Sequence, residues 1–193
     1  MSLILEKGSS LPLTKEDGKT PLNKVRVELS WNLNTGASQY AFDLDVLSAV
    51  CKNENLQAVS TSEVAYWGQK NTQAITVSPD NTTGIGDGVD EFLDITLSKV
   101  PAEGDRIPVL VYIYKARDKN QSFAQVDGAE VVIRDLENGN VVGSCKISEK
   151  GSSSDESLLV GVFEKQADGT FIYNQVNEFF DKSFEEWVGV FTS

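Results

Sequence analysis

An acidic, glycine-rich stretch carries the clearest chemical signal in this chain of 193 residues. Between positions 80 and 91 it packs four carboxylates, one asparagine and three glycines into twelve residues. Glycines let the backbone turn its carbonyls inward, and carboxylate and amide oxygens are the ligands that a hard cation such as calcium prefers. Without a cation, carboxylates held so closely would repel one another, and some would have to take up protons. The side-chain oxygen donors of the stretch include Asp80, Asn81, Asp87, Asp90 and Glu91.

The spacing of this stretch is not that of an EF-hand. Counting from Asp80, the twelfth position is Glu91, as an EF-hand requires. The sixth position is Ile85 instead of glycine, and the flanking residues have the alternation of strands rather than the periodicity of helices. Because Gly- and Asp-rich turns also occur in solvent without an ion, the stretch alone leaves both interpretations open.

A second pair of carboxylates, Asp43 and Asp45, lies within the otherwise apolar segment 40–47. Residues two apart on a strand share a face, so both aspartates are expected on one side and Leu44 on the other. Two carboxylates on a partly buried strand are costly unless a positive charge neutralises them. The alternative interpretation is an edge strand whose acidic face lies in water.

The same carboxylates give an alternative function, a carboxylate-dependent hydrolase. Glycoside hydrolysis uses two carboxyl groups about 5–10 Å apart, and the candidate pairs are Asp43 with Asp45 or Asp87 with Asp90. The sequence identifies neither an aromatic cleft nor a general acid in an apolar pocket, so we expect a protein that is not an enzyme. The chain contains no histidine, which excludes Ser-His-Asp triads and histidine-based metal sites.

Charge, cysteines and hydropathy restrict the partners and the compartment. The chain has 17 Lys and Arg against 29 Asp and Glu, and the net charge of −12 disfavours nucleic acid as a partner because phosphates are repelled. Cys51 and Cys145 are too few for a thiolate zinc site, and we expect two buried free thiols in a reducing cytoplasm. Neither a signal sequence nor a membrane span is expected, since every apolar run is short.

The elements that must position these carboxylates are mainly strands. Alternation of apolar and polar residues, with turn signals at Asn138-Gly139 and Asp168-Gly169, predicts β-hairpins. We expect one domain over residues 1–193 with an all-β fold, a two-sheet antiparallel β-sandwich with a short C-terminal helix. The helix is predicted because Ser183 and Glu186 fit a capping box ahead of an aromatic face. This face is expected to pack on the sandwich, and a partner-binding helix is the alternative. The expected strands cover 25–31, 93–97, 107–114, 131–133, 141–147, 158–165 and 170–176.

In their order along the chain, these motifs resemble the TerD family, which is named for tellurite resistance. The sequence Asp43-Leu44-Asp45 is similar to a signature of that family, and residues 80–91 are similar to its calcium loop. The similarity runs over nearly the whole length. Its other landmarks are 11–15, 22–31, 100–101, Ala116 and 121–126.

The resemblance implies a β-sandwich that binds calcium, as two ions, at one end, and it implies no catalytic reaction. Ile85 and Val89 replace residues that are often polar or acidic in the family, so one ion site is expected to be weaker or completed by water. The side-chain ligands that it implies are Asp43, Asp45, Asp80, Asn81, Asp87, Asp90 and Glu91, while Gly84 and Gly86 supply backbone geometry or carbonyls.

The resemblance also implies a cellular role in resistance to tellurite and other stress. Family members are thought to act in protein complexes near the inner face of the membrane, so we expect a scaffold or sensor with protein partners. The aromatic residues Trp67 and Trp187 are candidate contacts at the surface, although Trp67 also suits a partly buried sheet position. A cyclic-nucleotide binder is a further alternative, but no glycine-rich phosphate loop opens a helix here.

Overall fold

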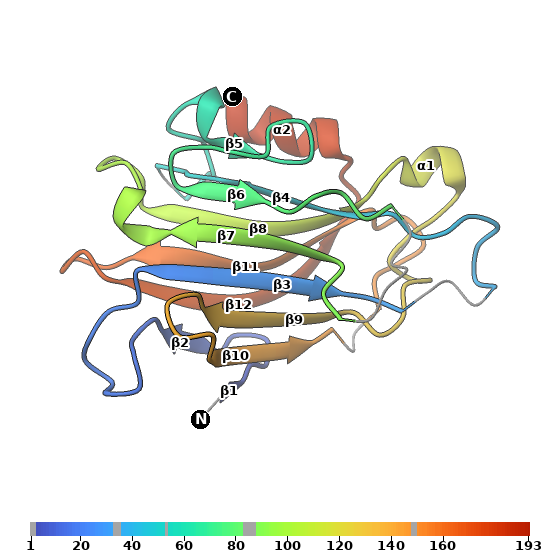
Figure 1. Cartoon of the computed structure of the whole chain (residues 1–193). Helices are drawn as coiled ribbons and strands as arrows, with labels where there is room; N and C mark the ends of the chain where they lie inside the picture. Colours follow the sequence, from blue (N-terminus) through green and yellow to red (C-terminus); the bar gives the residue numbers. More distant parts are fainter. Residues whose placement is uncertain (1–2, 33–35, 53, 83–87, 148–149) are drawn as a thin grey trace.

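Two six-stranded sheets pack face to face in the computed structural model, which describes residues 3–32, 36–52, 54–82, 88–147 and 150–193 (Figure 1). This confirms the expected β-sandwich. The first sheet, sheet A, has the order β1 (Leu3–Ile4), β10 (Val141–Lys146), β9 (Glu130–Asp135), β3 (Lys24–Ser30), β7 (Glu91–Thr96) and β6 (Ile75–Val77). The second sheet, sheet B, has the order β2 (Ser10–Pro12), β12 (Phe171–Phe180), β11 (Ser157–Lys165), β8 (Arg106–Ile113), β4 (Leu44–Ala49) and β5 (Val64–Ala65).

The helices are few and short. Two α-helices, α1 (Ala116–Lys119) and α2 (Phe184–Thr192), accompany two 3-10 turns, η1 (Thr61–Glu63) and η2 (Leu97–Lys99), within the described ranges. Both predicted hairpins are present, since β9 pairs with β10 and β11 pairs with β12 in antiparallel fashion. Gly139 and Gly169 take positive φ angles of 79° and 84° in the two turns, a conformation that glycine adopts at little cost.

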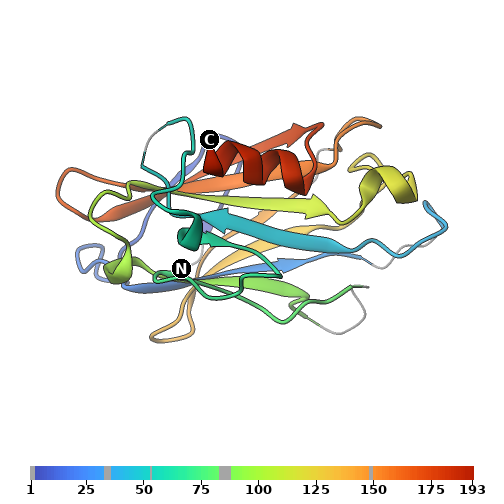
Figure 2. The same ribbon diagram turned by 90° about the horizontal axis from the view of Figure 1, so that it is seen from above.

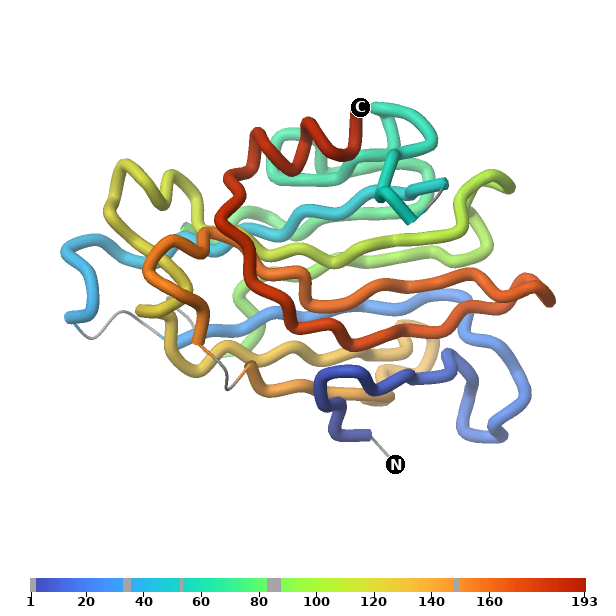
Figure 3. The backbone as a smooth tube through the Cα atoms, turned by 180° about the vertical axis from the view of Figure 1, so that it is seen from behind, coloured from blue at the N-terminus to red at the C-terminus, as the bar shows by residue number. Residues whose placement is uncertain are grey.

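Residues 3–12 join the two sheets along one side of the sandwich. Strand β1 pairs with β10 in parallel, which corrects the expectation of purely antiparallel sheets. Gly8, with φ of +85°, then turns the chain so that β2 pairs with β12 of the other sheet. From behind, the blue N-terminal segment runs along the lower border of the molecule (Figure 3). One short segment therefore forms an outer strand of each sheet.

The main core lies between the sheets and follows the period of two. From β3 it takes Val25 and Val27, which are at most 3% exposed, and from β4 it takes Leu44 and Val46. Burying alternate apolar side chains in this way removes their surface from water, which is the main favourable contribution to folding. The same alternation places the intervening residues of β4 on the other face of sheet B.

A second apolar cluster covers that other face of sheet B, and helix α2 lies over it (Figure 2). Ser183 accepts a hydrogen bond from the Glu186 backbone N–H while the Glu186 side chain accepts one from Ser183, which confirms the capping box. Trp187 is only 4% exposed, and its indole N–H donates to the Ser157 hydroxyl at 2.8 Å. The ring of Trp187 packs on the sheet, which confirms that the aromatic face of the helix lies on the sandwich. The alternative in which Trp187 is a surface contact is wrong, whereas Trp67 is 41% exposed.

None of the helices in the described part of the chain is both long and apolar enough to cross a membrane.

Candidate metal centre

The start of strand β4 presents the two aspartates that the sequence pairs. Leu44 and Val46 belong to the core between the sheets, so Asp43 and Asp45 alternate with them, as predicted. Strand β4 pairs with β8 from Leu44 onward, whereas β5 pairs with it only at Ser48 and Ala49. The aspartates are nevertheless 8% and 3% exposed, so the alternative in which the acidic face lies in water is wrong.

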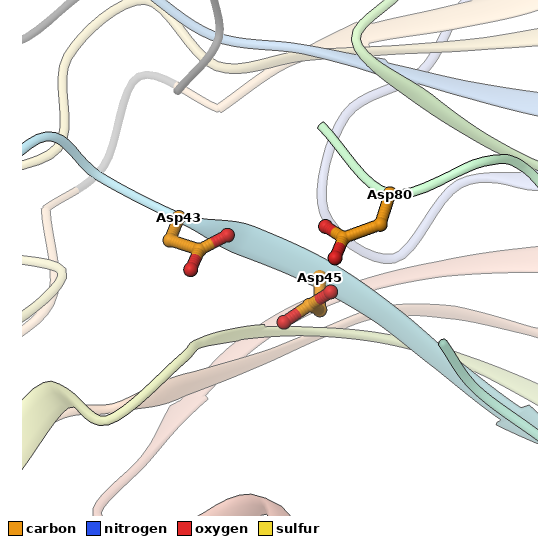
Figure 4. Close-up of side chains that lie close together, drawn as sticks. All are labelled: Asp43, Asp45 and Asp80. Atoms are coloured by element: carbon orange, nitrogen blue, oxygen red, sulfur yellow. The ribbon is translucent and has the colours of Figure 1, made fainter. Parts of the chain in front are cut away.

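A third carboxylate comes from the other sheet. After β6 of sheet A ends at Val77, the chain runs on to Asp80, whose side chain points toward Asp43 and Asp45 (Figure 4). One carboxylate oxygen from each of these three residues lies within 4.8 Å of the other two. We call these three residues the acidic cluster. Its members come from two segments far apart in sequence, and Asp80 is the exposed one.

The geometry of the acidic cluster is compatible with a shared cation. Calcium holds its oxygen ligands at about 2.3–2.6 Å, so two ligands of one ion are at most about 5 Å apart. The observed separations fall within that limit. Three carboxylates are fewer than the six to eight oxygens that calcium takes, so backbone carbonyls, further side chains or water would have to complete the shell.

The electrostatics of the acidic cluster show how costly its charges are. Burial, followed by the neighbouring charges of Asp43 and Asp80, raises the pKa of Asp45 from 3.8 to about 7. Burial is also the main cause that raises the pKa of Asp43 above its ordinary value, against the opposing effect of Lys119. The chain thus places ionisable oxygens where only a positive charge makes their ionised forms favourable.

Glu91, at the start of β7, lies beside the acidic cluster and is 2% exposed. One of its carboxylate oxygens accepts a hydrogen bond from the Val46 backbone N–H at 2.9 Å, and the other accepts from the Asn81 backbone N–H at 3.4 Å. Burial, followed by the charge of Asp45, raises the pKa of Glu91 to about 8. Glu91 therefore ties sheet A to the β4 backbone and adds negative charge next to Asp45.

Asn81 and Asp90 hold the two ends of the acidic loop together. The Asn81 side-chain amide donates to one Asp90 oxygen at 3.0 Å, and the backbone N–H of Trp31 donates to the other at 3.0 Å. This clamp closes the loop at its base and fixes the direction in which Asp80 leaves β6.

Several predicted residues cannot be placed. Gly84, Gly86 and Asp87, together with the neighbouring Ile85, lie outside the described residues. Val89 is described and is 47% exposed. The ligand roles of all nine predicted residues remain predictions, and what the structure adds is that Asp43, Asp45 and Asp80 converge while Glu91 and Asn81 are linked to each other beside them.

Sequence analysis missed one charged residue at this site. The ammonium of Lys119, the last residue of α1, lies 3.4 Å from an Asp43 carboxylate oxygen. The two residues are separated by 76 positions, and α1 is a single turn with no amphipathic pattern. Because no local signal links them, only the folded chain reveals the contact.

Comparison with known proteins gives a consistent family assignment. The family model described as "TerD domain" matches residues 1–188. A tellurium resistance protein TerD of Serratia marcescens is 31% identical over 173 residues, which covers 89% of this chain and 88% of that protein. General stress protein 16U of Bacillus subtilis is 34% identical over 135 residues, covering 69% of this chain and 68% of that protein.

A solved structure confirms the fold independently. The crystal structure of a homologue of telluride resistance protein (TerD) from Streptomyces coelicolor superposes with a TM-score of 0.69 at 18% identity. The match covers 86% of this chain and 95% of that one. At this level of identity, the likeness shows a common fold.

Proposed function

This chain belongs to the TerD family, and from that membership and the acidic cluster we propose that it is a non-catalytic calcium-binding module of a bacterial stress-resistance system. The observation that carries the proposal is the convergence of Asp43, Asp45 and Asp80, with oxygens within 4.8 Å of one another. Two of these carboxylates are largely buried, and buried carboxylates are retained at low cost only when a cation neutralises them.

The position of the acidic cluster suggests what the ion does. Asp43 and Asp45 belong to sheet B, whereas Asp80 follows a strand of sheet A, so one ion would bridge the sheets at one end of the sandwich. A ligand that binds only the folded state stabilises it by RT ln(1 + [L]/Kd), which is about 2.7 kcal/mol at a hundredfold excess over Kd. The ion would therefore act as a clip between the layers, and its loss would loosen them.

The direct test is calcium binding by chelator-stripped protein. We expect calorimetry to detect a heat of calcium binding. The melting temperature should also rise more in calcium than in the same concentration of magnesium, because magnesium demands a stricter octahedral geometry. Asp45→Asn should abolish both signals. Asp118→Asn, which removes the same charge from an exposed position of α1, should preserve them. Absence of heat together with an unmoved melt in the wild type would refute the proposal.

The number of ions has its own measurement. We propose two ions, as the resemblance of residues 80–91 to the calcium loop of the TerD family implies. Native mass spectrometry of stripped protein titrated with calcium should show mass steps for one ion and then two. A titration that stops at one ion would reduce the proposal to a single site.

We further propose a cytoplasmic scaffold or sensor role within a protein complex near the inner face of the membrane. Its support is the family membership, with relatives named for tellurium resistance and general stress. The two buried free thiols, Cys51 and Cys145, are consistent with a reducing compartment. The native mass spectra, recorded on complexes purified by a tag on this chain, should contain partner proteins whose association depends on calcium.

A further inference from the structure

We propose that Lys119 is a tethered cation, which occupies the acidic cluster in the ion-free protein and sets the calcium affinity because calcium must displace it. The inference rests on the proposed calcium site and adds to it a residue outside the predicted ligand set. It follows from the position of one ammonium group, from the scarcity of other cations around the cluster, and from the way α1 is held.

The position of Lys119 is that of a counter-ion. Its ammonium nitrogen lies 3.4 Å from Asp43 Oδ2, and the two side chains are 21% and 11% exposed. At this distance the pair is a salt bridge, and its partial burial limits screening by water and salt. An ammonium is a compact point charge on a flexible stem, so it can be replaced by another cation without a change in the backbone.

The acidic cluster has little other positive charge. Among the described residues, Asp45 and Asp80 form no ion pair with any Lys or Arg, and the only ion pair of Asp43 is the one with Lys119. Only one of the three carboxylates therefore has an ion-pair partner among the described residues. A divalent ion within coordination distance of the same oxygens interacts more strongly with them than one ammonium at 3.4 Å.

Helix α1 holds the backbone of Lys119 in place. Its flanking residues Lys115 and Asn120 adopt left-handed φ angles of 55° and 49°, so the turn is bounded at both ends. The Gln121 side-chain amide donates to the carbonyls of Tyr40 and Ala41, just before the acidic strand begins. Lys119 is therefore fixed at its backbone beside Asp43, and the long side chain remains the adjustable part.

The same ammonium also has an aromatic contact. The Lys119 nitrogen lies 5.4 Å from the centre of the Tyr114 ring, within the range of a cation–π interaction. When calcium takes the carboxylate oxygens, the ammonium can move away from Asp43 and keep this aromatic contact. Displacement therefore requires rotation of one side chain rather than unfolding of α1.

The test compares Lys119→Met with Lys115→Met. Lys115 belongs to the same turn, its nitrogen lies 5.2 Å from the Tyr114 ring, and it forms no ion pair with a described carboxylate, so both variants remove one positive charge from one region. By calorimetry on stripped protein, Lys119→Met should bind calcium about tenfold more tightly, since both competition and repulsion are removed. Lys115→Met should change Kd by less than about twofold, and Lys119→Arg, which keeps the charge, should stay near the wild type.

A second measurement reports on the ion-free state. In EDTA, Lys119→Met should melt about 3 °C below Lys115→Met, because the acidic cluster has lost its counter-ion. In the wild type, acetylation of the Lys119 amine, followed by mass spectrometry, should become faster in calcium while that of Lys115 stays constant.

The outcomes separate this inference from the proposed function. Calcium heat in the wild type with an unchanged Kd in Lys119→Met overturns the role of Lys119 and leaves the calcium site standing. Equal melting of the two Met variants in EDTA also overturns it. Absence of calcium heat in the wild type and in both variants overturns the two proposals together.

Discussion

The outer face of sheet A and the acidic cluster neutralise their carboxylates in different ways. On sheet A, Arg26 forms two hydrogen bonds to the Asp94 carboxylate at 2.6 and 2.8 Å. Arg134 similarly forms two to Glu28, both at 2.8 Å. Each carboxylate there has its own guanidinium from an adjacent strand. In the acidic cluster, by contrast, only Asp43 has an ion-pair partner among the described residues, the ammonium of Lys119.

The difference distinguishes carboxylates that are paired within the protein from carboxylates that are available to bind an ion. A bidentate Arg–carboxylate pair is geometrically complete and has no vacancy for another ion. The acidic cluster is incomplete, since its carboxylates exceed the cation present within the described residues. Net acidity of the chain alone therefore does not locate an ion site. An ion site is located instead by the local balance between carboxylates and guanidinium groups.

The largest expected effect is a change in the free energy of unfolding, which has opposite signs in the two regions. In EDTA at neutral pH, Asp45→Asn should stabilise the protein by about 2 kcal/mol, because it removes a buried charge whose pKa is raised to about 7. Asp94→Asn should destabilise it by about 1 kcal/mol, because it leaves Arg26 without its partner. Urea unfolding measures both changes. Destabilisation by both substitutions would show that the acidic cluster is an ordinary paired site.

The pH dependence of stability should also distinguish the regions. Asp45 and Glu91 have folded-state pKa values raised to about 7 and 8 from 3.8 and 4.5, so the folded chain binds more protons than the unfolded chain between those values. The stability of the ion-free protein should therefore fall as the pH rises from about 5 to 8. With saturating calcium the fall should disappear, because calcium binds the ionised carboxylates.

Thermal melts at several pH values in EDTA and in calcium check this expectation. Asp45→Asn should flatten the slope in EDTA, whereas Asp94→Asn should leave it unchanged, since it removes neither of the two buried carboxyl groups, Asp45 and Glu91. A melting temperature in EDTA that climbs steadily from pH 5 to 8 would contradict the raised values.

The smallest expected effect is at the far end of β4. Cys51 follows this strand at the end remote from Asp43, is buried, and has its pKa raised to about 12, mainly by burial. Its thiol should react slowly with iodoacetamide at pH 8, and equally slowly with or without calcium, because the thiolate is the reactive form. Mass spectrometry of alkylated peptides, with urea-unfolded protein as the control, measures this. A calcium-dependent rate would mean that the ion acts along the whole strand.

Local periodicity predicted the parts of the fold that neighbours in sequence determine. The alternation at Asp43 and Asp45, the turn at Gly139 and the capping box of Ser183 each depend on residues a few positions apart, and each is present in the structure. The approach of Asp80 to the aspartate pair required the sheets to be placed, and in the sequence it was supported only by the family resemblance.

Contacts between segments far apart in the chain could not be predicted from the sequence, for a physical reason. The parallel pairing of β1 with β10 and the contact of Lys119 with Asp43 each join segments whose local patterns carry no information about the other partner. The helical spacing of Trp187 correctly indicated an aromatic face that packs on the sandwich, but spacing alone could not identify Ser157 on sheet B as its hydrogen-bond partner.

The pairing of β1 and β2 has a consequence for how proteolysis would affect the protein. Because β1 shields β10 and β2 shields β12, a single proteolytic cut after Pro12 would release the cover from two borders at once. Newly exposed backbone donors and acceptors on a strand border are templates for intermolecular pairing. Loss of this one short segment would thus leave each of the two sheets with an uncovered strand border at which another chain could pair.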